Sequence, residues 1–177
     1  MTPNRERAER VILEIVRQAG GSIGKTKLFK AFWLSHLFYS KMARGYLTDW
    51  PIVRMPNGPG IHRADVLIEE LISLGNLARS HESRGPFTEI ICRLTGKEIE
   101  GELPPVAFDA IREAVKFLEG HTAASISELS HDFSRSWNSV GNGEELNIYS
   151  DLIPDDVYEQ REKELIELKK AYEELFG

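Results

Sequence analysis

Three consecutive residues of this 177-residue chain, Ser130, His131 and Asp132, have the side chains of a hydrolytic triad. A working triad needs each group to reach the next one, and consecutive side chains on a helix or loop point apart. The pattern therefore indicates a polar corner between a helix and a loop, at which Asp132 or Ser130 caps the next turn.

A second pattern is the stretch 19–26, Ala-Gly-Gly-Ser-Ile-Gly-Lys-Thr, which fits a relaxed phosphate-binding loop. Such a loop follows an apolar strand, so that backbone N–H groups and the start of a helix surround the phosphate. Here a charged amphipathic segment precedes it, and no acidic strand end follows to hold magnesium. We interpret the stretch as a junction between two helices.

The histidines and the single cysteine are the remaining reactive side chains. No two of the five histidines have the spacing of paired metal ligands, although ligands from distant positions stay open as an alternative. His36 interrupts the most apolar stretch, so we expect it to hydrogen-bond inside the core or to lie at a pocket edge. Cys92 is expected to be structural, because a catalytic thiol needs an electropositive, partly exposed setting. We expect no cofactor.

The elements that must position these side chains are mostly helical. Apolar residues at three-and-four spacing predict helices over about 5–19, 25–44, 62–74, 106–118 and 155–176. Asn4 caps the first of these helices and Pro154 opens the last. The second helix has no charge from Ala31 to Tyr39, so it should be the central core helix. Ser125 and Glu128 have capping-box spacing and predict a short helix that begins there.

Strands are predicted over 52–55, followed by a turn at 56–59, and over 77–80 and 87–95 as a hairpin. The predicted fold is mostly α with a small β-hairpin. It is a single compact domain, winged-helix-like in its N-terminal half and followed by C-terminal helices. We place this domain at 1–153 and an acidic amphipathic helix at 154–177.

The last helix carries an apolar stripe made of Leu165, Leu168, Tyr172 and Leu175. The stripe could pair with a second chain in a homodimer, or it could pack back on the protein's own core. We favour packing on the core.

Composition and charge narrow the class of protein. Hydrophobic residues make up 41% and charged residues 28%, as in soluble globular domains. The net charge of -6 disfavours bulk attraction to nucleic acid or to an anionic membrane. No apolar run is long enough to span a membrane and no signal core follows the N-terminus, so we expect a cytoplasmic protein. One cysteine excludes an internal disulfide framework.

Three segments, in this order, resemble the Panacea (SocA-like) antitoxin domain, a family earlier known as a phage-associated domain of unknown function. They are Lys27-Leu28-Phe29-Lys30-Ala31-Phe32-Trp33, then Met55-Pro56-Asn57-Gly58-Pro59, then Glu128-Leu129-Ser130-His131-Asp132 with Trp137 five residues further on. The resemblance extends over about residues 5–153. The chain departs from the family at Asn57, where an aromatic residue typically precedes glycine-proline.

The resemblance implies a mostly helical domain that neutralises a protein toxin by binding, with no catalysis of its own. Direct sequestration and delivery of the toxin to a protease are both open. Cations and large aromatic residues are enriched in binding hot spots, so the candidate partner-binding surface combines the three segments with their neighbours. Its residues are Lys27, Lys30, Trp33, His36, Asn57, Gly58, Pro59, His62, Arg63, Ser130, His131, Asp132 and Trp137. The favoured alternative is that they lock the core helix to its neighbours.

Two other hypotheses come from different classes. A winged-helix DNA-binding transcriptional regulator would place the helix at 61–74 in the major groove. That helix carries Asp65, Glu69 and Glu70 against the single cation Arg63, so phosphate repulsion disfavours nucleic acid as a partner. A small hydrolase or metal enzyme would need histidines and carboxylates that converge in one cleft.

Overall fold

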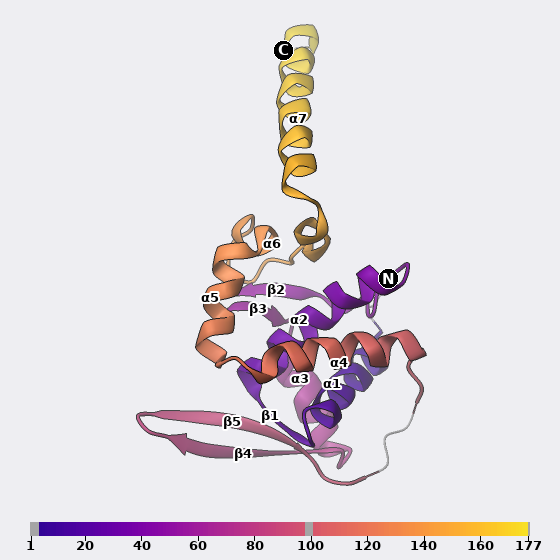
Figure 1. Ribbon diagram of the computed structural model, residues 1–177, viewed down its shortest axis with the longest axis vertical. Coiled ribbons are helices and arrows are strands. Elements are labelled where there is room, and N and C mark those ends of the chain that lie inside the picture. The colour runs from indigo at the N-terminus through magenta and orange to yellow at the C-terminus, as the bar shows by residue number, and fades with distance from the viewer. Residues whose placement is uncertain (1–3, 98–100, 177) are drawn as a thin grey trace.

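The computed structural model describes residues 4–97 and 101–176 (Figure 1). In chain order the elements are α1 (Arg5–Gln18), β1 (Ser22–Gly24), α2 (Lys25–Met42), β2 (Ile52–Met55), β3 (Gly58–Ile61), α3 (Ala64–Ser73), β4 (Leu77–Arg84), β5 (Phe87–Leu94), α4 (Pro105–Glu119), α5 (Ala123–Phe133), α6 (Arg135–Asn138), the 3-10 helix η1 (Ile148–Leu152) and α7 (Asp155–Phe176). The predicted mostly helical fold with a small antiparallel sheet is confirmed. Residues 1–3 and 177, at the outer limits of the two predicted units, lie outside the described residues.

The core is built on α2, as its uncharged middle predicts. Phe32 at the centre of α2 is completely buried, and both α1 and α4 pack against this helix (Figure 1). The predicted cap is also present, because the Asn4 side chain accepts a hydrogen bond of 2.9 Å from the Arg7 backbone N–H. Helices α1 and α2 at the start of the chain therefore share one apolar core with α4, which follows both hairpins.

A three-stranded antiparallel sheet with the order β1–β5–β4 lies beside these helices. Strands β4 and β5 form the predicted hairpin, with Leu77 opposite Leu94 at its base. Strand β1 was not predicted, because three residues between two helices are too few to show an alternating pattern. It pairs Ile23 with Cys92 of β5, and it lies inside the glycine-rich stretch 19–26, between α1 and α2.

A second hairpin joins β2 to β3. The predicted turn at 56–59 is too long, because Met55 pairs with Gly58 and Arg54 with Pro59. The sequence of β3, Gly-Pro-Gly-Ile, has almost no strand character of its own. Its extended conformation depends on β2 as a partner, so only Pro56 and Asn57 remain in the turn.

The carboxylates of α3 tie this helix to three other parts of the domain. Asp65 pairs with Lys25 of α2 at 2.7 Å and Glu69 pairs with Arg79 of β4 at 2.5 Å. Glu70 pairs with Arg5 of α1 at 2.9 Å. The acidic residues that disfavour DNA binding therefore help to position α3 within the fold.

The prediction that α5 begins at a capping box formed by Ser125 and Glu128 is wrong. The N-cap of α5 is Thr122, whose hydroxyl accepts a hydrogen bond of 3.1 Å from the Ser125 backbone N–H. Glu128 consequently lies in the middle of α5 and not at a capping-box position. Thr122 and Ser125 are both good capping residues by type, and Thr122 is the one that caps the helix.

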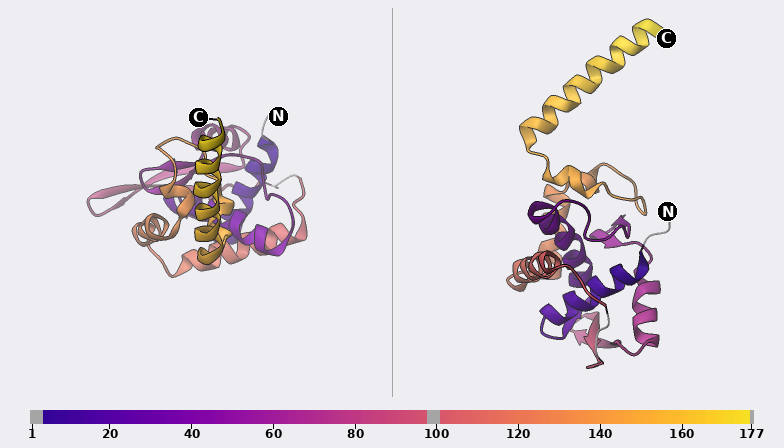
Figure 2. Two further views of the ribbon diagram at one scale, coloured as in Figure 1. Left: turned by 90° about the horizontal axis from the view of Figure 1, so that it is seen from above. Right: turned by 90° about the vertical axis from the view of Figure 1, so that its right-hand side faces the viewer.

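The last helix, α7, projects away from the body of the protein (Figures 1 and 2). The favoured prediction that it packs back on the core is wrong, because none of its residues is buried. Only Ile153 and Pro154 connect η1 to α7. Of the helices that the structure describes, none combines the length and the apolar character needed to cross a lipid bilayer.

Candidate protein-interaction site

Lys30 of α2 is a buried cation that holds the β2–β3 turn. Its side chain is only 2% exposed, and Nζ donates hydrogen bonds to the backbone carbonyls of Asn57 and of Pro59, the latter at 3.0 Å. Burial lowers the pKa of Lys30 to about 8, so the amine still carries its charge at neutral pH. A central core helix tolerates this residue because the two carbonyls supply the polar partners that burial requires.

Gly58 is the point at which the turn approaches α5. Its φ of +96° lies in the left-handed region, which glycine adopts at no steric cost. A Cβ atom at this position would lie 2.1 Å from Ser130 Oγ and 2.6 Å from Lys30 Nζ. Both the backbone conformation and the available space therefore require glycine here.

Ser130 is completely buried, and its hydroxyl donates a hydrogen bond of 2.8 Å to the Ser127 carbonyl within α5. His131 is half-buried, and its ring stacks on Trp137 with the centroids 4.2 Å apart. Asp132 is exposed. The three side chains of the triad-like pattern thus occupy different surroundings, and the observed contacts of Ser130 and His131 are structural.

Trp137 of α6 joins the third segment to the second. Its indole Nε1 donates a hydrogen bond of 3.1 Å to the Met55 carbonyl, and the Arg54 guanidinium lies 4.0 Å from the centre of the ring. A cation over the face of a tryptophan is attracted by the ring quadrupole. The end of α5 is therefore held to β2 by stacking, a hydrogen bond and a cation–π contact.

Asp151 of η1 completes this corner, and the sequence analysis did not find it. One carboxylate oxygen accepts a hydrogen bond of 2.8 Å from the Ser136 backbone N–H. The other accepts from the hydroxyls of Ser134 at 2.9 Å and Ser136 at 2.8 Å. A lone aspartate fifteen and seventeen residues from its partners gives no local pattern, so no sequence signal pointed to it.

The three segments that carry the family resemblance therefore converge on one corner, made by α2, the β2–β3 turn and the junction of α5 with α6. Their burial divides the thirteen candidate residues. Buried members are Lys30, Trp33, His36, Gly58, Pro59, Ser130 and Trp137; Lys27 and His131 are half-buried; Asn57, His62, Arg63 and Asp132 are exposed. The buried members hold the fold in this conformation, and only the exposed ones are free to meet a partner directly.

The corner does not include Lys27, His62 or Arg63. Lys27 donates a hydrogen bond of 3.3 Å to the Leu118 carbonyl and so connects α2 to α4. His62 and Arg63 lie between β3 and α3, where the His62 carbonyl accepts a hydrogen bond of 2.8 Å from the Trp50 indole. Arg63 has a φ of +48°, which is uncommon for a residue with a side chain.

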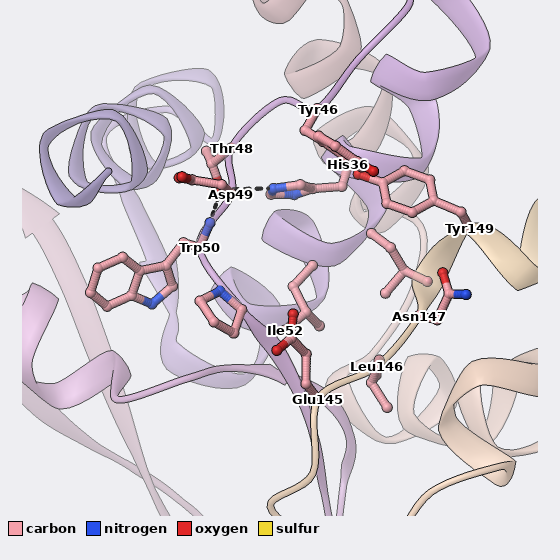
Figure 3. A pocket seen from close by; sticks show the side chains of 12 residues that line it. His36, Tyr46, Thr48, Asp49, Trp50, Ile52, Glu145, Leu146, Asn147 and Tyr149 are labelled. Atoms are coloured by element: carbon pink, nitrogen blue, oxygen red, sulfur yellow. Dashed lines mark hydrogen bonds between the residues drawn. The ribbon is translucent and has the colours of Figure 1, made fainter. Parts of the chain in front are cut away.

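His36 forms part of the floor of a separate pocket of about 490 Å³ (Figure 3). Its Nδ1 lies 2.7 Å from the Phe32 carbonyl, which can only accept, so Nδ1 carries the proton. Its Nε2 accepts from the Thr48 hydroxyl at 3.0 Å, and Thr48 Oγ1 itself accepts from the Trp50 N–H at 3.1 Å. Burial lowers the pKa of His36 to about 4, so the ring is neutral at pH 7.

The walls of this pocket come from two chain segments about a hundred residues apart. Tyr46 and Tyr149 meet with ring centroids 5.0 Å apart, and burial raises the pKa of Tyr149 to about 12. Trp50, Asp49 and Glu145 complete the polar and aromatic lining (Figure 3). The expectation that His36 lies at a pocket edge and the expectation that it is hydrogen-bonded in the core are both confirmed, since the ring does both.

The described residues contain no cluster of metal-ligand side chains, and their single cysteine is buried. No group of three or more His, Cys, Asp and Glu side chains within residues 4–97 and 101–176 is placed to hold a metal ion. Cys92 is 1% exposed, and burial raises the pKa of its thiol, which opposes formation of the reactive thiolate.

Comparisons with known proteins returned nothing for this chain: no protein-family model, no curated protein and no solved structure matches it.

Proposed function

We propose that this protein is a non-catalytic, antitoxin-like binding module that neutralises a protein toxin, by sequestering it or by delivering it to a protease. The observation that carries the proposal is the convergence of the three family-like segments. Lys30 holds the turn through the Asn57 and Pro59 carbonyls, and Gly58 of this turn lies against Ser130. Trp137 binds the Met55 carbonyl just before the turn, so segments separated by up to about a hundred positions form one connected set of contacts. A resemblance confined to unconnected surface patches would not have this property.

The chemistry of the corner suits the display of a rigid binding surface. Buried polar contacts from Lys30 and Trp137 fix the turn and the end of α5, so little conformational freedom remains to be lost on binding. Asn57 is exposed on this turn, and Asp132 is exposed at the end of α5. Phe133, next to Asp132, is 77% exposed and is the kind of large aromatic side chain that anchors protein interfaces.

The test is co-expression with the product of the adjacent reading frame. The protein should rescue growth from that product and co-purify with it, whereas the variant N57A/D132A/F133A should lose both while keeping its thermal midpoint. The matched control is Phe87→Ala, which removes an equally exposed phenylalanine (75%) from the start of β5 and should keep rescue. Rescue by the triple variant would refute this placement of the binding surface.

The same experiment separates the two modes of neutralisation. Sequestration leaves the toxin abundant and bound, so it should accumulate with the antitoxin. Delivery to a protease should lower the toxin level, and the level should recover in a host that lacks the protease. No rescue of any neighbouring product would refute the antitoxin proposal itself.

A second candidate function, a DNA-binding regulator, is favoured by the order of the elements. Three helices, α1, α2 and α3, followed by the β4–β5 hairpin resemble the order of elements in a winged helix. In such a protein α3 would enter the major groove. Asp65 and Glu69 are exposed on α3, with Arg63 as the cation at its start, which opposes contact with phosphates.

Duplex binding at physiological salt decides between the two. We expect no sequence-specific binding to fragments of the protein's own operon. A specific site bound with a Kd of about 10 nM would favour the regulator instead.

A further inference from the structure

The long helix α7 presents an apolar stripe to solvent along its whole length. None of its residues is buried, and its attachment to the body lies in its first turn. There Arg135 forms an ion pair with Asp155 and lies 4.6 Å from the centre of the Tyr158 ring. The rest of the helix extends beyond the body (Figures 1 and 2).

Seven large apolar side chains are exposed on α7: Val157, Leu165, Ile166, Leu168, Tyr172, Leu175 and Phe176, with exposed fractions from 39% to 74%. At 100° per residue, all of them except Ile166 fall within an arc of about 100°. Spacings of three and four residues along such an arc define the seam of a coiled coil. An apolar stripe of this kind on a helix without neighbours marks an interaction surface.

We propose that α7 pairs with α7 of a second copy of this chain, as an antiparallel two-helix coiled coil. The orientation follows from Arg161, which lies in the middle of the apolar arc. A parallel pair would place two Arg161 guanidinium groups against each other in the seam. An antiparallel pair with Leu165 level with Leu168 of the second copy instead places Arg161 level with the Tyr172 ring, a cation–π arrangement.

The charges beside the seam agree with this orientation. In an antiparallel pair, side chains on one flank of the seam meet the same flank of the other helix. Glu162 and Lys169 both lie on that flank, and the alignment places Glu162 of each copy within two residues of the level of Lys169 of the other. Two opposite-charge contacts are formed. A helix that carries eight acidic and four basic residues thus pairs with itself through its complementary charges.

The shape of the molecule supports the same choice. The 22 residues of α7 span about 33 Å at 1.5 Å per residue, and the body is attached at one end. An antiparallel pair separates the two bodies at opposite ends of the helices. A parallel pair would bring both bodies to one end, and each body is much wider than the helix (Figure 1).

The experiment is the mass of the full chain in solution, measured by sedimentation equilibrium between about 1 and 200 μM. Because the seam has only three heptads, we expect self-association in the micromolar range, from one 20.1 kDa chain to two. The variant L165E/L168E should stay monomeric at every concentration. Its matched control is Ile166→Glu, which adds the same charge to an exposed apolar position outside the arc and should keep the dimer.

Charge reversal tests the orientation. Lys169→Glu should weaken the dimer about tenfold, and the double variant E162K/K169E should restore it. The double variant E164K/K169E should not restore the dimer, because Glu164 would face Lys169 of the other copy only in a parallel pair. The thermal midpoint of the body at low concentration should be the same in all variants, since α7 buries nothing there.

Two results would overturn the inference: a wild-type chain that is monomeric at 200 μM, or an Ile166→Glu variant that loses the dimer as completely as L165E/L168E. Restoration by E164K/K169E would overturn the antiparallel orientation. The toxin is absent from these measurements, so their outcome is independent of the antitoxin proposal.

Discussion

Replacement of Gly58 by alanine tests whether the corner is packed as the structure shows. The substitution adds one methyl group, and that group meets two separate obstacles. The backbone at Gly58 has a φ of +96°, and the new Cβ would lie 2.1 Å from Ser130 Oγ and 2.6 Å from Lys30 Nζ. Real Cβ atoms do not approach other atoms this closely, so the turn, α5 or the lysine must move.

The expected loss of stability is the sum of two parts. An alanine in the left-handed region costs about 1–2 kcal/mol. Forcing an extra methyl group into a packed site costs about 1–3 kcal/mol more. Gly45 provides the matched control, because its φ of +91° is nearly the same and nothing lies within 4 Å of its added Cβ. Gly45→Ala should therefore show the backbone part alone.

The assay is urea and thermal unfolding of both variants. Since about 1 kcal/mol shifts the midpoint of a domain of this size by about 2–4 °C, Gly58→Ala should lower it by about 10 °C and Gly45→Ala by about 4 °C. The double variant G58A/S130A should lose less than the sum of the two single variants, because removal of the Ser130 hydroxyl relieves the closest contact. Equal losses for Gly58→Ala and Gly45→Ala would refute the convergence of the turn with α5 and Lys30.

Two other predictions concern the core. Phe32→Ala should lower the free energy of unfolding by about 3–5 kcal/mol, because Phe32 is completely buried at the centre of α2, and a loss below about 1 kcal/mol in urea unfolding would remove this helix from the core. The pKa of His36 falls from 6.5 in the unfolded chain to about 4 in the fold. Between these two pH values the unfolded chain binds more protons than the folded one, so the free energy of unfolding decreases as pH falls from about 6.5 to 4. The stabilising contribution of the neutral ring that is lost over this window is about 3 kcal/mol. Unfolding of the wild type and of His36→Gln at pH 7 and pH 4.5 checks this, and a stability difference between the two that stays constant with pH would contradict it.

The elements with strong local patterns were predictable from the sequence. Asn4 followed by an amphipathic repeat defines α1, and the uncharged run around Phe32 places α2 in the core, because these properties depend on neighbours within a few turns. Strands β1 and β3 were not predictable for the opposite reason. Ser22–Gly24 and Gly58–Ile61 have little strand propensity, and they are extended because β5 and β2 provide hydrogen-bond partners.

The candidate site shows the same division. Sequence reasoning found Lys30, Gly58, Ser130 and Trp137 through a family resemblance, and it left open whether they form a surface or a scaffold. All four residues are buried in the structure. Sequence reasoning missed Asp151 and the pocket walls at Tyr46 and Tyr149, because their partners are supplied by distant segments.

The last helix separates the two kinds of information most clearly. The sequence by itself determined that residues 155–176 form an amphipathic helix, since periodicity and local charge pairs are properties of the segment alone. It did not determine what the apolar stripe contacts, because packing on the core and pairing with a second chain use the same stripe. The tertiary structure excludes the first alternative, since no residue of α7 is buried and the helix projects away from the body.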